Sequence, residues 1–418
     1  MADSLSWMRF CRIPLGTRVP HPSTLEKITT RCGPGVLEQL NRALLVKADR
    51  AKVLKTDQVR GDTTVVEANV RYPTDSGLLV RAISRIVALV GHIHAAGAAS
   101  RTKVRDRRRA ARRRAHSIGA HLKAAHRAGQ RRRAGGHRRA GRPGEASITE
   151  AAAVLANARR YASRQGAAAG GRLAAAIGEL DTVLDRAGRV VAQTRTRLAG
   201  QPVDSATRLV SLHDDQARPI VKGRLGKPVE FGYKAQAVDN RDGIVLDHSV
   251  HQGNPADAPL LAPAIGRITQ LLGRAPRAAT ADRGYGEASV DAALSEAGVK
   301  TVVIPRKGKP PAARREIEHS RGFRRLVKWR TGSEGRISYL KHRYGWDRSL
   351  CDGLAGAATW CGLGVLAHNT VKIALLVDAA QPATPATTQP APRPRAEPAP
   401  TGPPRPGHQA NRQPAPCA

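Results

Sequence analysis

The chain has 418 residues, with 70 Lys and Arg against 33 Asp and Glu, and a formal net charge of +37. This length allows two or three domains, and five cysteines without CxxC spacing argue against a disulfide framework or a zinc site. The charge favours a polyanionic partner, because Lys and Arg that neutralise phosphates supply most nonspecific affinity for nucleic acids. A competing explanation for part of the arginine excess is a GC-rich coding sequence, which enriches Ala, Arg, Gly and Pro.

No stretch of eighteen or more apolar residues suggests a membrane span, and the N-terminus lacks the apolar segment of a signal peptide. We therefore expect a cytoplasmic protein without a membrane partner. No internal repeat of solenoid period is present.

Residues 1–60 are predicted to form short helices, and Pro22-Ser23-Thr24 resembles a helix start. The β-branched segment 61–70 predicts a strand. Asp75 is expected to cap the helix that follows. Within this helix one buried face is predicted from residues at three- and four-residue steps, namely Leu79, Ile83, Ile86 and Val90.

A basic block occupies residues 101–142, where clusters of arginine lie among Ala, Gly and His. It is expected either to be solvated until it meets phosphate or to form the exposed face of long helices. Because no aromatic residues interleave it, we predict contacts with a nucleic-acid backbone and no base stacking. Residues 148–200 are predicted to be helical, with a Gly-rich break at 169–171.

Strands at 229–238 and 244–250 flank a turn and predict a hairpin. A helix is expected at 257–273, a short strand ends at Asp282, and a helix at 286–297 precedes a buried strand at 301–304. Helices are expected over 315–378, and the last forty residues, rich in Pro, Ala, Thr and Gln, should be disordered.

This order predicts an α/β fold in which a mixed sheet is flanked by helices and a basic helical insertion follows the first strand. The expected divisions are an N-terminal helical region (1–60), a catalytic core (61–80 and 223–345), the insertion (81–222), C-terminal helices (346–378) and a low-complexity tail (379–418).

Three acids are placed where chemistry is expected. Asp62 begins the first strand, Asp282 ends a later one, and Glu334 lies near a helix start. Each acid could instead have a purely structural role. Asp62 could end a loop, Asp282 could orient a turn, and Glu334 could interact with the helix dipole. Carboxylates gathered in one place need a counter-charge, for which Mg²⁺ is suited, and two such ions could assist a displacement at phosphorus.

The sequence resembles the DDE transposases of insertion sequences, particularly the group catalogued as not classified yet (ISNCY). The resemblance covers most of residues 5–375. Its strongest block is Arg330-Thr331-Gly332-Ser333-Glu334-Gly335-Arg336-Ile337-Ser338, and further blocks include Asp62-Thr63-Thr64-Val65-Val66-Glu67, Gly253-Asn254-Pro255-Ala256-Asp257 and Ala281-Asp282-Arg283-Gly284-Tyr285.

Related transposases carry a signature with Tyr, Arg, Glu and Lys at the spacing Y-(2)-R-(3)-E-(6)-K. Arg330, Glu334 and Lys341 match it, whereas Val327 occupies the tyrosine position. The resemblance implies that Glu334 is the third metal ligand and that Arg330 and Lys341 contact DNA phosphates. Further DNA contacts are expected from Arg336, Arg306 and Lys307.

The resemblance implies an RNase H-like core that uses Mg²⁺, replaceable by Mn²⁺ and with two ions expected, at Asp62, Asp282 and Glu334. It also implies a bacterial, nucleoid-associated enzyme that nicks transposon ends and transfers the freed 3′-hydroxyl to target DNA, acting as a homodimer on double-stranded DNA. The chain starts close to the stretch Ser6-Trp7-Met8-Arg9-Phe10, where relatives have a longer N-terminal region, so a shortened and inactive copy is one expectation. Alternatives are an RNase H-like nuclease without strand transfer, and a non-enzymatic basic protein that coats nucleic acid.

Overall fold

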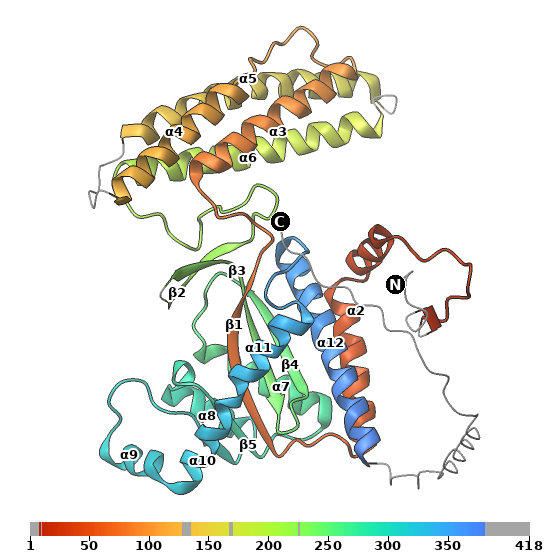
Figure 1. Ribbon diagram of the computed structural model, residues 1–418, viewed down its shortest axis with the longest axis vertical. Helices are drawn as coiled ribbons and strands as arrows, with labels where there is room; N and C mark the ends of the chain where they lie inside the picture. The colour runs from red at the N-terminus through yellow and green to blue at the C-terminus, as the bar shows by residue number, and fades with distance from the viewer. Residues whose placement is uncertain (1–7, 10, 128–134, 167–169, 225, 381–418) are drawn as a thin grey trace, which may run out of the picture. The chain divides into compact units, whose positions relative to one another are not determined.

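The computed structural model describes residues 8–9, 11–127, 135–166, 170–224 and 226–380. Its centre is a six-stranded sheet with the order β2-β3-β1-β5-β6, in which β4 also pairs with β3 (Figure 1). The strands are β1 (Gln58–Glu67), β2 (Arg218–Arg224), β3 (Lys227–Asn240), β4 (Val245–Gln252), β5 (Ala278–Ala281) and β6 (Thr301–Val303). β1 is antiparallel to β3 and parallel to β5, so the sheet is mixed, consistent with an RNase H-like fold.

Side chains of β1 alternate between the two faces of the sheet. On one face, Val59 packs in a cluster with residues of α7 (Ala258–Leu272) and α8 (Ala288–Glu296). On the other face, Val66 packs with residues of α11 (Gly332–Tyr344) and α12 (Gly353–Ala380). Arg60 and Asp62 share the face of Val66, so the strand presents them toward α11.

Helix α2 (Pro22–Arg50) starts at the predicted residue and bends at Gly33, whose φ of 67° is non-helical. It is joined to α12 and β4 through one buried amide. The Asn369 Nδ2 donates hydrogen bonds to the Asn41 Oδ1 at 2.9 Å and to the Val245 carbonyl at 2.8 Å, while the Val245 N–H donates to the Asn369 Oδ1. These contacts fix the two helices beside the hairpin.

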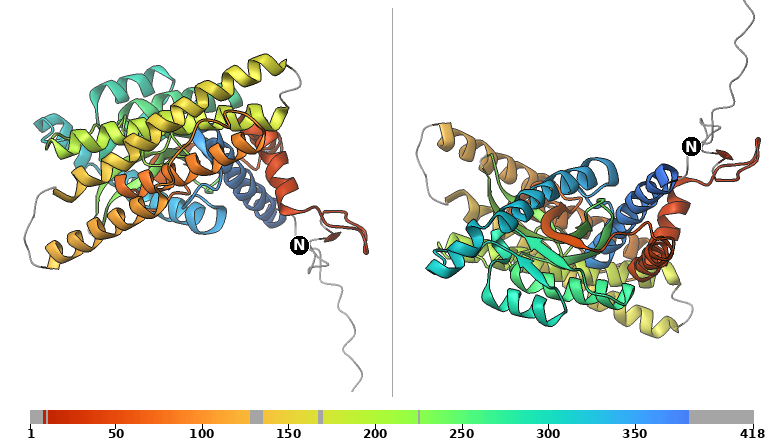
Figure 2. Two further views of the ribbon diagram at one scale, coloured as in Figure 1. Left: turned by 90° about the horizontal axis from the view of Figure 1, so that it is seen from above. Right: turned by 90° about the horizontal axis from the view of Figure 1, so that it is seen from below.

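Four helices lie between β1 and β2 in the chain: α3 (Asp75–Ala95), α4 (Arg108–Arg127), α5 (Gly135–Gln165) and α6 (Gly171–Leu198). They pack side by side (Figure 2) around apolar residues that include Ile86, Ala158 and Leu180. In the described part of the basic block, residues 112–114 are exposed on α4. The arginines there lie on an exposed helix face, which was the second of the two expectations for this block.

Helices α9 (Ala312–His319) and α10 (Arg321–Arg330) follow β6. Phe323 and Leu326 of α10 are buried against Ala278 of β5 and Val303 of β6. Only Thr331 separates α10 from α11, so the end of α10 lies beside β1 together with the start of α11.

Three local expectations are corrected. Thr74, and not Asp75, caps α3, since the Thr74 side chain accepts a hydrogen bond from the Gly77 N–H, whereas Asp75 is buried against Gln193 and Arg197. β6 is only partly buried, because Thr301 is exposed. β2, which no sequence pattern predicted, pairs with β3.

In the part of the chain that the structure describes, two helices, α3 and α12, are long and apolar enough to cross a membrane by length and composition. This corrects the expectation that no such stretch exists. This is weak evidence for a membrane span. α3 buries apolar residues such as Ile86 and Ile93 in the helical bundle, and α12 buries Val365 against the sheet. Core packing accounts for the apolar residues that both helices bury, while Val371 and Leu375 near the end of α12 are exposed.

Candidate active site

Asp62 and Asp282 meet at one edge of the sheet. β5 ends beside β1 at the pair Gly61 and Ala281, and Asp282 directly follows it. Asp62 follows Gly61 inside β1 (Gln58–Glu67), which corrects the expectation that it begins the first strand. Burial raises the pKa of the Asp62 carboxyl, a hydrogen bond from Ser333 opposes that rise, and the negative charge of Asp282 adds to it. The two carboxylates need a positive charge nearby if both are to be ionised.

Asp62 is also fixed to the start of α11. The Ser333 hydroxyl donates a hydrogen bond to the Asp62 Oδ2 at 2.9 Å, and the Thr63 N–H donates to the Asp62 Oδ1 at 2.8 Å. Ser333 is buried. This contact places Glu334, the next residue in the chain, beside the same edge of the sheet.

The Glu334 side chain is 75% exposed and does not join the other two acids directly. Its Oε1 lies 3.7 Å from the Arg330 Nη2, and the Arg330 Nη1 lies 4.0 Å from the Asp62 Oδ2. The Arg330 guanidinium therefore stands between the two carboxylates. Among the residues that the structure describes, no group of three or more Asp, Glu, His or Cys side chains is close enough to hold a metal ion.

Asp257, which was not among the candidate catalytic acids expected from the sequence, is a fourth carboxylate at this edge. Its Oδ1 accepts a hydrogen bond from the Thr63 hydroxyl at 2.8 Å and lies 2.6 Å from the Nζ of the buried Lys234. A Cβ added to Gly284 would lie 2.8 Å from both the Asp257 Oδ2 and the Asp282 Oδ1. Glycine is thus required between these carboxylates. The signal in the sequence was an acid at the start of a helix directly after a hairpin.

Arg60, also missed, holds the junction of α10 and α11 against the sheet. Its guanidinium forms two hydrogen bonds with the Asp239 carboxylate, at 2.8 and 2.9 Å, and donates a third to the Trp329 carbonyl at 2.8 Å. It also lies 4.7 Å from the centre of the Trp329 ring. A Cβ on Gly332 would lie 2.5 Å from the Arg60 Nη1, so glycine permits this close approach. Arg60 is buried, and a lone guanidinium would be costly there without Asp239.

Residues 202–370 match the family model of the transposase DDE domain. No curated protein and no solved structure matches the chain. The match supports a transposase function and a mixed α/β core of the RNase H-like kind.

The matched region, residues 202–370, contains Asp282 and Glu334, whereas Asp62 precedes it. Asp62 reaches the domain because β1 inserts between β3 and β5, pairing with both. The central strand of the sheet therefore comes from a part of the chain that the family match does not cover.

The positions that the resemblance assigns to the Tyr-Arg-Glu-Lys signature lie on two consecutive helices. Val327 and Arg330 are on α10, and Glu334 and Lys341 are on α11. Val327 packs with Phe323 and Leu326 against the sheet. The tyrosine position is thus filled by an apolar side chain directed toward the core.

Three of the residues expected to contact DNA are engaged within the protein. The Arg306 Nη2 lies 3.0 Å from the Asp291 carboxylate, the Lys307 Nζ lies 2.6 Å from the Glu287 carboxylate, and the Arg336 Nε lies 3.2 Å from the Asp239 carboxylate. Arg306 and Arg336 are also largely buried. Their role in DNA binding stays a prediction. It requires each side chain to leave its carboxylate partner and to bind a DNA phosphate in its place.

The donor set suits a divalent cation. Asp62, Asp282 and Asp257 provide carboxylate oxygens, which are the ligands that Mg²⁺ prefers. The Arg330 guanidinium stands in for a cation between Asp62 and Glu334. The residues therefore fit a metal in charge and chemistry, provided that the exposed Glu334 side chain turns inward.

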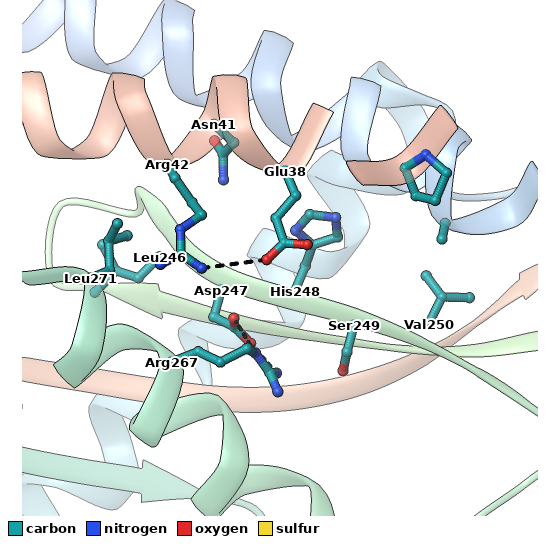
Figure 3. Close-up of a pocket in the computed structure, with 12 residues that line it drawn as sticks. Glu38, Asn41, Arg42, Leu246, Asp247, His248, Ser249, Val250, Arg267 and Leu271 are labelled. Atoms are coloured by element: carbon teal, nitrogen blue, oxygen red, sulfur yellow. Dashed lines mark hydrogen bonds and ion pairs between the residues drawn. The ribbon is translucent and has the colours of Figure 1, made fainter. Parts of the chain in front are cut away.

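A well-formed cavity lies elsewhere, between α2 and β4 (Figure 3), with a volume of about 120 Å³. Its charged side chains are already paired, Glu38 with Arg42 and Asp247 with Arg267. Burial lowers the pKa of His248, which lines the cavity, to about 4, so its ring is neutral near pH 7. With no unpaired charge in its lining, this cavity lacks the groups that hydrolysis of a phosphodiester requires, and the carboxylate edge is the better candidate.

Proposed function

We propose that this protein is the DNA transposase of a bacterial insertion sequence of the ISNCY-like group. It cleaves DNA at the transposon ends in a metal-dependent reaction and transfers the 3′-hydroxyl to target DNA. The observation that carries this proposal is the transposase DDE domain at residues 202–370, in which Asp282 follows a strand paired with the strand of Asp62. A cytoplasmic, nucleoid-associated location accords with such a domain.

The proposed catalytic residues are Asp62, Asp282 and Glu334. They would hold Mg²⁺, or Mn²⁺ in its place, with two ions in the active enzyme. Bound there, the metal supplies activation of the attacking oxygen and stabilisation of the leaving oxygen.

The side chains around these acids have separate roles in the proposal. Ser333 orients the Asp62 carboxylate, and the Lys234 ammonium compensates Asp257 so that the edge does not carry four uncompensated negative charges. Arg330 leaves Glu334 when a DNA phosphate takes its guanidinium, which frees Glu334 to turn inward. Lys341 binds phosphate further along α11.

The proposed domains are an N-terminal helical region (1–60), a catalytic core (61–80 and 223–345), a basic insertion (81–222), C-terminal helices (346–378) and a tail (379–418). The partners are the inverted-repeat ends of the element and target DNA, bound by a homodimer. The segment 379–418 lies almost wholly outside the described residues.

A strand-transfer assay tests the function. The protein is incubated with Mg²⁺, a labelled duplex that carries the pre-cut element end, and a supercoiled target plasmid. Joined products support the transposase, cleavage without joining supports an RNase H-like nuclease, and binding without either supports a protein that only coats DNA.

A further inference from the structure

Helix α10 exposes a stripe of four cations beside the candidate active site: Arg321, Arg324, Arg325 and Lys328. Steps of three and four residues place them on one face of the helix. The opposite face buries Phe323 and Leu326 against β5 and β6. α10 contains no acidic residue, so its exposed face carries charge of one sign.

These four side chains have no hydrogen bond or ion pair with any residue in the described part of the chain. The neighbouring cations differ in this respect, since Arg306 and Arg314 share the Asp291 carboxylate and Lys307 pairs with Glu287. Like charges three and four residues apart weaken a helix slightly. The stripe therefore keeps its charge available for a partner outside the protein.

The helix dipole does not explain the stripe. A cation is favourable at the C-terminal end of a helix, which accounts for Lys328 and Arg330. Arg321 is the first residue of α10, where a cation is unfavourable. Packing does not explain the stripe either, because all four side chains are exposed.

The stripe lies next to the candidate active site. It spans about 10 Å of helix and leads toward Arg330, whose guanidinium contacts Asp62 and Glu334. A polyanion that follows the stripe thus arrives at the carboxylates. No aromatic ring lies on the stripe, and the Arg60 guanidinium occupies one face of the neighbouring Trp329 ring, so the stripe itself offers no aromatic platform for bases.

We propose that the α10 stripe binds consecutive backbone phosphates of double-stranded DNA next to the phosphate that is cut. Such contacts position DNA without reading its sequence. The placement relative to the cut rests on the proposed function, whereas binding of the backbone does not.

The test compares two variants that lose the same charge. R324Q/K328Q removes one Arg and one Lys from the stripe, and K47Q/R50Q removes one Lys and one Arg from exposed positions at the end of α2. Affinity for a 30-base-pair duplex of random sequence is measured between low and high salt, in the D282N background so that no DNA is cut. Each lost phosphate contact should reduce the slope of log affinity against log salt by about 0.9.

We expect R324Q/K328Q to lower the slope by about one to two relative to K47Q/R50Q, and to weaken binding by about tenfold or more near 0.1 M salt. Equal slopes for the two variants would overturn the proposal. Melting temperatures of both variants should match the parent, because the substituted side chains are exposed, so weaker binding would not reflect misfolding.

Cleavage is scored separately with the protein that retains Asp282. If that protein does not cut DNA in Mg²⁺ but the slopes of the two variants differ, the proposed function is wrong and the proposed DNA-binding role of the stripe is retained. If it cuts DNA and the two variants have equal slopes, the proposed role of the stripe is wrong and the proposed function is retained.

Discussion

At the scale of single residues, the carboxylates at the edge of the sheet differ in their partners. Asp257 is compensated by Lys234, and Glu334 by Arg330, whereas Asp62 faces Asp282 and has its pKa raised by burial. The position with the greatest need for a cation is therefore the pair of Asp62 and Asp282. A metal would relieve the repulsion there.

Asp282→Asn is expected to abolish Mg²⁺-dependent cleavage while DNA affinity changes little. The amide keeps an oxygen for the Gly284 N–H, but it removes the charge that would hold a metal. Cleavage and binding are measured on the same duplex, with D204N at an exposed turn as the control. Cutting by D282N at the parental rate would show that Asp282 is not a metal ligand.

His248 should make the fold sensitive to acid. Its pKa is about 4 in the folded protein, mainly because of burial, and near 6.5 in an unfolded chain. Between these values the unfolded chain binds the extra proton, so stability is present above pH 6.5 and is lost as the pH falls toward 4. From pH 7 to pH 5 this residue should lower the free energy of unfolding by about 2 kcal/mol.

The measurement for His248 is urea unfolding at both pH values for the parent and for H248Q. Other groups that titrate in this range are common to the two proteins, so the difference isolates the imidazole. An identical pH dependence in H248Q would contradict the expectation.

At the scale of elements, the junction of α10 and α11 carries Arg330, Ser333 and Glu334, and Arg60 attaches that junction to β1. Arg60→Lys keeps the charge but cannot form two parallel hydrogen bonds with Asp239 and a third with the Trp329 carbonyl. We expect cleavage to slow by about 10- to 100-fold, because small displacements of catalytic groups are costly.

A matched control is Arg267→Lys, which breaks the two-hydrogen-bond pair with Asp247 on the other side of the sheet (Figure 3). Both variants should lose stability. Only R60K should speed amide exchange over residues 329–336 and slow cleavage of DNA. Equal effects of the two variants on amide exchange and on cleavage would show that Arg60 stabilises the fold without positioning the active site.

At the scale of the whole molecule, the region that matches the transposase DDE domain pairs with a strand from outside it. β1 pairs with β3 and β5 and contributes Val59, Val65 and Val66 to the core. A fragment of residues 202–370 should therefore show no cooperative thermal transition by circular dichroism. Joining residues 52–70 to it through a flexible linker should restore one, and cooperative melting of the fragment alone would contradict this dependence.

The helical insertion is expected to add to DNA affinity through its exposed arginines. R112Q/R113Q/R114Q on α4 should weaken DNA binding and flatten its salt dependence more than K27Q/K47Q/R50Q on α2, which removes the same charge. Binding is measured by fluorescence anisotropy across a salt series. The same slope for both triple variants would place the contacts outside this part of α4.

The sequence by itself determined the local elements. Alternating β-branched residues and a turn at Asp242-Gly243 predicted the hairpin, and apolar steps from Leu79 to Val90 predicted the buried face of α3. The position of Asp282 after a strand was also predicted, because its strand end is recognisable, whereas Asp62, expected at the start of its strand, lies inside β1. These features depend on residues that are neighbours in the chain.

Only the tertiary structure decided which charges remain available. Arg306, Lys307 and Arg336 are engaged by acids within the fold, whereas the stripe on α10 is not. Asp257 meets Lys234, and Arg60 meets Trp329, across long separations in sequence. The composition of the sequence gives only the number of charged residues. Which of them form ion pairs depends on distances of a few ångströms, and these are set by the packing of the fold.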